Sequence, residues 1–176
     1  MQPVALTLER PFNLMRRFGA ASLAIIAAIA IANALVLSNF VTGRLLDREA
    51  QVTMDLVQNV LQADGYIFAT PENLASMAGL MKDFFDRCYY PVLERINGRP
   101  YTTLVCAGSD GHNAVRQLER IATGWRLKAV AAPLIVCTHA QTPADILRAK
   151  QIGPQDLAKC REIGAALAAG LALGVF

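Results

Sequence analysis

The chain has 176 residues, of which 54% are hydrophobic, and a formal net charge of +3 at pH 7. This length suits one ordinary domain. The charge is too mild and too dispersed to favour nucleic acid, because no run of like charges and no basic patch interleaved with aromatic residues occurs. We therefore expect no nucleic-acid partner.

In chain order, the first predicted element is a transmembrane helix over Phe18–Val41, a segment without a charged residue. A helix needs about 20 apolar residues to cross the hydrocarbon layer of a membrane. Arg16 and Arg17 before the segment and Arg44 after it are placed as expected for arginines that reach the lipid headgroups. We expect a single-pass protein of the bacterial inner membrane that contacts lipid through this helix, with residues 1–17 as a cytoplasmic or short leader segment.

Two alternatives remain for this segment. A buried core helix would normally have a shorter or more interrupted apolar run. A signal peptide could be cleaved at Ala32–Ala34, but the apolar run continues past that point and would leave a hydrophobic stub. The side of the membrane stays open: the arginine count slightly favours an inside N-terminus, since Arg10 adds to the pair before the span and only Arg48 adds to Arg44 after it.

Residues 42–62 continue with helical spacing as an extension or linker. Leu45, Val52, Leu56 and Val60 fall near one stripe. Such a stripe pairs with a copy of itself, giving a homo-oligomer, or packs on its own domain. This part of the chain resembles the start of a bacterial membrane-bound sensor protein, such as a sensor histidine kinase. The resemblance rests on Arg16-Arg17, one span and the following TGRLLDREAQVTMDLVQ.

Residues 63–176 alternate short apolar runs with amphipathic segments, which predicts an α/β domain with a parallel sheet of about three strands. The expected strands are Gly65–Thr70, Tyr101–Gly108 and the run LKAVAAPLIVCTHA, and the expected helices are Met77–Tyr90, Ala114–Leu127 and Gln155–Gly174. We expect the apolar end of the last helix, from Ile163, to be a buried face.

The four cysteines, Cys88, Cys106, Cys137 and Cys160, form no CxxC pair and lie apart from any histidine doublet. This spacing predicts neither a zinc site nor a redox dithiol motif. Each lies among apolar residues, which favours reduced thiols in the core over disulfides, and weakly favours a reducing compartment.

Two loops are expected where ligands bind in parallel sheets, at the carboxyl ends of the strands. Thr70–Met77 places Thr70, Asn73 and Ser76 before a helix N-terminus, where free N–H groups can hold an anion or a ring carbonyl. In the second loop, Cys106–Asn113, glycines let the backbone approach a flat ligand closely.

The motif ADGYIFATPENLASMAGLMKDFFDR resembles the middle of flavodoxin-fold proteins of the NAD(P)H-dependent FMN reductase kind, and AGSDG resembles their next flavin-contacting loop. The resemblance runs from about Gln62 to Phe176. It implies an FMN cofactor, with NAD(P)H as a possible electron donor and no catalytic side chain, because the flavin carries the chemistry. His112 and His139 are then expected to be surface or loop residues. The residues implied beside the flavin are Thr70, Pro71, Glu72, Asn73, Leu74, Ser76, Ala107, Gly108, Ser109 and Gly111.

The chain departs from this family at its start. The first strand and the phosphate-binding loop are missing, and the apolar helix with its extension occupies their place, as in a fusion or a truncation. The missing strand would neighbour Gly65–Thr70, so that strand is expected to have an unpaired apolar edge. The resemblance implies a membrane-anchored, FMN-dependent oxidoreductase. The alternative is a non-enzymatic fragment that acts as a membrane anchor or as a sensor-like interaction module.

Overall fold

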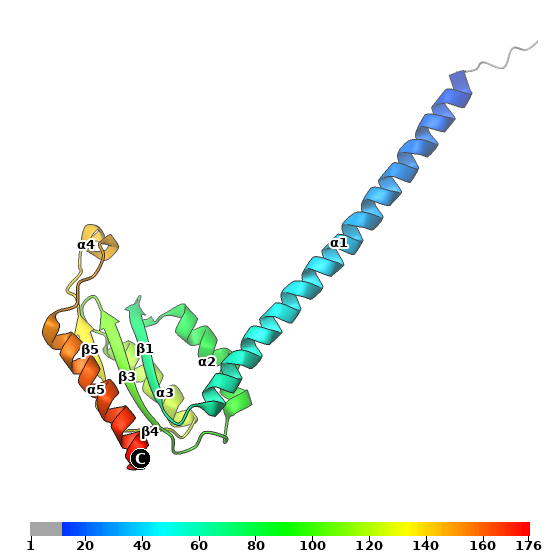
Figure 1. Ribbon diagram of the computed structural model, residues 1–176. Coiled ribbons are helices and arrows are strands. Elements are labelled where there is room, and N and C mark those ends of the chain that lie inside the picture. Colours follow the sequence, from blue (N-terminus) through cyan, green and yellow to red (C-terminus); the bar gives the residue numbers. More distant parts are fainter. Residues whose placement is uncertain (1–11) are drawn as a thin grey trace, which may run out of the picture. The chain divides into compact units, whose positions relative to one another are not determined.

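The computed structural model describes residues 12–176 (Figure 1). Arg10 and most of the predicted leader lie outside the described residues. The chain divides into two compact units, with the boundary inside the first helix between Gln51 and Val52. The elements are α1 (Phe12–Gln62), β1 (Tyr66–Asn73), β2 (Ser76–Met77), α2 (Gly79–Val92), β3 (Pro100–Ala107), α3 (His112–Gly124), β4 (Lys128–Ala129), β5 (Leu134–Cys137), α4 (Pro143–Leu147) and α5 (Pro154–Leu173).

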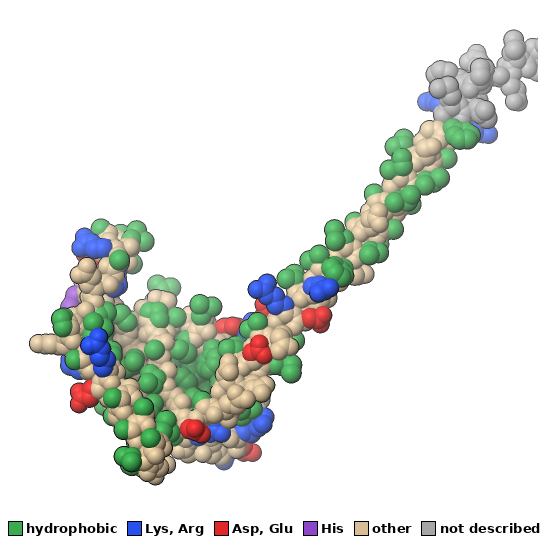
Figure 2. All heavy atoms as spheres, in the orientation of Figure 1, with side chains coloured by type: hydrophobic (Ala, Val, Ile, Leu, Met, Phe, Trp, Pro, Cys, Tyr) green, Lys and Arg blue, Asp and Glu red, His purple; other side chains and the backbone are tan. Residues whose placement is uncertain are grey.

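The first unit consists of α1 up to Gln51. Its hydrophobic side chains are exposed along the predicted span, and charged side chains appear after it (Figure 2). Arg44 lies over the ring of Phe40, 4.9 Å from its centroid. Among the described residues, α1 is the one helix long and apolar enough to cross a membrane. The span and its predicted extension therefore form one continuous helix.

The second unit begins with the last turns of α1. In the predicted stripe, Val60 is buried and Leu56 packs partly buried against the same core. Arg99 stabilises this helix end, because its Nη1 donates hydrogen bonds to the carbonyl of Leu61 at 2.9 Å and to the Tyr66 hydroxyl at 3.1 Å. The C-terminal part of the stripe, Leu56 and Val60, therefore packs on its own domain, which is one of the two outcomes left open by the sequence.

The sheet of the second unit is mixed, with the order β2-β1-β3-β4 and with β5 also paired to β3. Strand β1 runs parallel to β3 from Tyr66↔Tyr101 to Pro71↔Cys106, and β2 is antiparallel to β1. The α/β class is confirmed, but the sheet is mixed rather than wholly parallel, and it has five strands rather than about three. The expected third strand is wrong as a single element: it is broken into β4 and β5 by Val130–Pro133, where Pro133 has no N–H for a ladder hydrogen bond.

The open edge expected for the first strand is present among the described residues. On the side of β1 away from β3, only Glu72 and Asn73 pair, with β2. Tyr66–Pro71 has no neighbouring strand there among residues 12–176. A groove of about 730 Å³ follows this edge and is also lined by Leu80 and Phe84 of α2.

The core lies between the sheet and the helices α2 and α3. Its centre is an aromatic cluster in which Phe85 and Trp125 are almost fully buried, and Phe68 of β1 packs against both rings. The indole N–H of Trp125 donates to the carbonyl of Tyr89 at 3.1 Å. These contacts fix α2 and α3 on one face of the sheet, so the loops that precede both helices have defined positions.

Helix α5 crosses the other face of the sheet (Figure 1) and contacts β3 and β5. Its bounds agree with the expected closing helix. The expected buried face is only partly right, because Leu167 and Gly170 are buried but Leu173 is 77% exposed. The helix meets two strands rather than a broad sheet, so much of its apolar surface has no cover within the described residues.

Candidate functional site

The two predicted loops meet at one edge of the sheet. Strands β1 and β3 are parallel neighbours, with Thr70 opposite Val105 and Pro71 opposite Cys106. Their carboxyl ends therefore lie side by side, and the segments that follow them form a single site. This is where ligands bind in parallel sheets.

The first segment is a hairpin rather than the expected loop. Strand β1 continues through Pro71 to Asn73, and Leu74 and Ala75 form a tight turn with φ angles of 51° and 56° before β2 begins. Proline is tolerated because it lies on the open edge of the sheet. Asn73 and Leu74 are exposed at the tip, and Leu74 is fully so. The predicted end of the strand at Pro71 was therefore wrong.

Polar contacts connect this hairpin to the two helices. Thr70 is buried, and its Oγ1 accepts a hydrogen bond from the Ala78 N–H, directly before α2, at 3.1 Å. Gln117 of α3 accepts from the Ser76 hydroxyl at 2.8 Å and from the Met77 N–H at 3.2 Å. Asn113 donates to the carbonyl of Ala75. The hairpin is thereby held against the start of α3.

Gln117 and Asn113 were not singled out from the sequence. Both lie on an amphipathic helix at positions that resemble ordinary solvated ones, and their partners are about 40 positions away in the chain. No local sequence signal could have identified them.

The second segment, Ala107–Gly111, needs its glycines. Gly111 has φ +84°, and a Cβ there would lie 2.6 Å from Cγ2 of Ile135. A Cβ on Gly108 would lie 3.2 Å from the carbonyl oxygen of Ala140. The Thr138 hydroxyl donates to the Ala107 carbonyl at 3.2 Å. The backbone here is closely surrounded, while Ser109 is exposed.

Glu72 joins the two segments. Its Oε2 accepts a hydrogen bond from the Gly111 N–H at 2.9 Å, and its Oε1 is buried without a partner among the described residues. The Asp110 carboxylate accepts from the His112 N–H at 3.3 Å. The N-terminus of α3, which carries the positive end of the helix dipole, is thus already occupied by two carboxylates of the chain itself.

A shallow apolar pocket of about 340 Å³ lies beneath these segments, between the sheet and α5. It is lined mainly by Ala69, Pro71, Leu104, Cys106, Val136 and Leu157. Burial, with a smaller contribution from neighbouring Cys137, raises the pKa of the Cys106 thiol, and Lys150 opposes this weakly. The thiol therefore stays protonated at neutral pH and is a poor nucleophile. All four cysteines are free, as expected, but the expected place in the core is right for Cys88 alone, because Cys106, Cys137 and Cys160 are only partly buried.

The two histidines are exposed, as predicted. His112 is the first residue of α3, and His139 follows β5 with φ 55°. Among the described residues, neither histidine side chain forms a hydrogen bond with the two segments; His112 contacts Asp110 through its backbone N–H.

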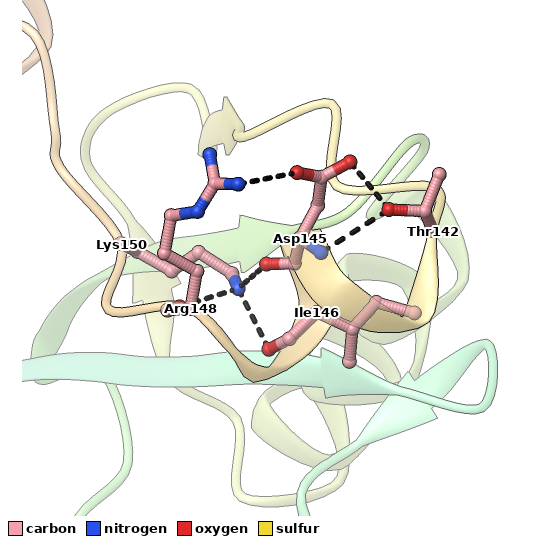
Figure 3. A network of polar contacts seen from close by, with 5 residues as sticks. All are labelled: Thr142, Asp145, Ile146, Arg148 and Lys150. Atoms are coloured by element: carbon pink, nitrogen blue, oxygen red, sulfur yellow. Dashed lines mark hydrogen bonds and ion pairs between the residues drawn. The ribbon is translucent and has the colours of Figure 1, made fainter.

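The segment after β5 folds around α4 (Figure 3). Thr142 caps the helix by accepting from the Asp145 N–H at 3.2 Å, and Arg148 pairs with the Asp145 carboxylate at 3.5 Å. The ammonium of Lys150 donates to the carbonyls of Ile146 at 2.7 Å and Arg148 at 2.9 Å. Arg148 and Lys150 therefore already interact with acceptors of their own segment.

The residues can be tested against the flavin that the sequence resemblance implied. The apolar pocket between the sheet and α5 fits the flat ring of a flavin. The phosphate group does not fit. In residues 12–62 the chain is a single helix, so this part holds no strand, loop and second helix to bind a phosphate. The flavin contacts of the ten residues named from the sequence remain predictions.

Comparison with known proteins gives two findings. The family described as NADPH-dependent FMN reductase matches residues 21–142. This match begins inside α1 and ends before α4, whereas the sequence resemblance was expected from about Gln62 to Phe176. A solved NADPH-quinone reductase from P. pentosaceus is similar with 16% identity and a TM-score of 0.42, over 52% of this chain and 66% of that one. No curated protein matches the chain.

Proposed function

Because this chain belongs to the NADPH-dependent FMN reductase family, we propose that it is an FMN-dependent NAD(P)H oxidoreductase attached to a membrane by α1. The observation that carries the proposal is the junction of the two segments through Glu72 and Gly111, at the carboxyl ends of β1 and β3. It supports the proposal because it joins the hairpin and the loop on which the residues expected beside a flavin lie.

Bound FMN would supply the redox chemistry, by accepting two electrons as hydride and passing them on. The chain would position the ring. Pro71 and Glu72 on the hairpin would lie along one edge, and Gly108, Ser109 and Gly111 along the other. Thr70 and Gln117 would act as positioning residues, because their hydrogen bonds hold the hairpin against α2 and α3.

The activity is tested by mixing the purified chain, loaded with FMN in mild detergent, with NADPH or NADH under anaerobic conditions. We expect the visible absorbance of oxidised flavin to disappear faster than it does for free FMN at the same concentration. Equal rates for free and protein-bound FMN would contradict an enzymatic role.

A second candidate function is a membrane-anchored module without flavin chemistry. The match to the family begins at residue 21, but residues 21–62 form part of one continuous helix. This observation favours the second candidate, since no phosphate loop is formed in those residues. This candidate predicts no saturable flavin binding at all, and therefore no flavin-dependent oxidation of NADPH.

Membrane attachment rests on α1. The side chains of Phe18–Val41 are exposed, whereas a core helix of a soluble protein is mostly buried. Replacing both Ile25 and Ile29 with lysine should release much of the chain from membranes washed with alkaline carbonate, because a lysine at the centre of a span costs about 2.5–3.5 kcal/mol on insertion scales. As a control, Met54→Lys, at a 65% exposed position beyond the span, should leave the chain in the pellet. Release of the unmodified chain would contradict the anchor.

A further inference from the structure

The charged groups around the site indicate which part of a flavin it would recognise. This inference rests on the proposed function. Within the hairpin segment 70–76 and the loop segment 107–113, the charged side chains are Glu72 and Asp110, and neither segment contains lysine or arginine. The rim of the site is therefore acidic.

The donors that usually attract a phosphate are already occupied here. A helix N-terminus binds anions through its free N–H groups. At the start of α3, the N–H groups of Gly111 and His112 donate to Glu72 and Asp110. Directly before α2, the Ala78 N–H donates to the Thr70 hydroxyl. At both helix N-termini beside the site, N–H groups therefore already donate to acceptors of the chain itself.

Three cations of the neighbouring elements α3 and α4 and the segment after α4 are engaged as well. Lys150 donates to backbone carbonyls around the end of α4, and Arg148 pairs with Asp145 (Figure 3). Arg116 of α3 donates to the side chain of Asn113 at 2.6 Å. Within the two segments, a phosphate would therefore meet two carboxylates and no lysine or arginine.

We infer that this site recognises a flavin by its ring alone, so that riboflavin, which lacks a phosphate, is bound about as tightly as FMN. The apolar pocket between the sheet and α5 would hold the ring, which the two molecules share. The phosphate of FMN carries about −1.5 to −2 charges at pH 7 and would extend into water, away from the acidic rim.

The test is a pair of titrations of the full chain in neutral detergent, one with riboflavin and one with FMN, followed by quenching of flavin fluorescence. We expect the two dissociation constants to agree within about threefold. FMN binding more than about tenfold tighter than riboflavin would overturn the inference and leave the proposed function standing. Binding of neither flavin would instead overturn the proposed function.

A substitution tests the role of charge separately. Glu72→Gln keeps the shape of the side chain and an acceptor for the Gly111 N–H but removes one negative charge. We expect FMN to gain about two- to fivefold in affinity relative to riboflavin, with the gain reduced in high salt. The exposed pair Lys82–Asp86 provides the control, since Asp86→Asn should leave the ratio unchanged. An unchanged ratio in a folded Glu72→Gln chain would contradict the electrostatic argument.

Discussion

Replacing Phe85 with alanine should lower the free energy of unfolding of the α/β unit by about 3–5 kcal/mol. Phe85 is 1% exposed, and its ring centroid lies 5.2 Å from those of Phe68, Phe84 and Trp125. Removing the ring deletes contacts with a strand, a helix and the residue that follows α3, and leaves a cavity that close-packed neighbours fill only in part.

The chain supplies its own probe and control for this experiment. Trp125 is the single tryptophan, so urea unfolding in mild detergent can be followed by its fluorescence. Tyr90 lies on the same helix and is 79% exposed, and Tyr90→Ala should change the stability by no more than about 0.5 kcal/mol. Similar midpoints for the two variants would show that the aromatic cluster is not the core.

Replacing Gly111 with alanine should destabilise the chain by about 2–4 kcal/mol and weaken flavin binding at least tenfold (about 1.4 kcal/mol). Two separate effects add. The left-handed φ of +84° disfavours any residue with a Cβ, and that Cβ would lie 2.6 Å from Cγ2 of Ile135 and 3.2 Å from Cβ of Ala107. The loop would have to shift, and the Glu72 contact would be lost with it.

Gly98 separates the two effects. Its φ is +78°, but a Cβ there would meet nothing within 4 Å. Gly98→Ala should therefore show only the backbone effect, about 1–2 kcal/mol, with flavin affinity unchanged. Equal losses of stability and equal flavin affinities in the two variants would mean that the surroundings of Gly111 contribute nothing.

Much of the fold follows from the order of patterns along the chain. Apolar runs followed by amphipathic segments predicted β1, α2, β3, α3 and α5 close to their observed bounds, because burial on one face imposes a period that the sequence carries locally. The apolar run Phe18–Val41 likewise predicted a helix, which is part of α1.

The errors arise where distant pairing overrides a local signal. Pro71 ends a strand by local rules, yet β1 continues past it because Glu72 and Asn73 pair with β2. The proline itself is tolerated because it needs no donor on an open edge. Similarly, the run from Leu127 reads as one strand, but Pro133 divides it into β4 and β5.

The candidate site was predicted in its position but not in its connections. The loops could be placed together because parallel strands end at one edge. The bonds from Glu72 to Gly111 and from Ser76 to Gln117 join residues about 40 positions apart and depend on how the hairpin turns at Leu74 and Ala75. Geometry of this kind is set by tertiary packing rather than by any motif.

The flavin site is tested most directly by titrating the purified full chain, in mild detergent, with FMN and following the quenching of flavin fluorescence. We expect saturable binding with a dissociation constant in the micromolar range, because the two segments would hold the ring without a phosphate loop. Quenching that fails to saturate up to high micromolar FMN would contradict the flavin site.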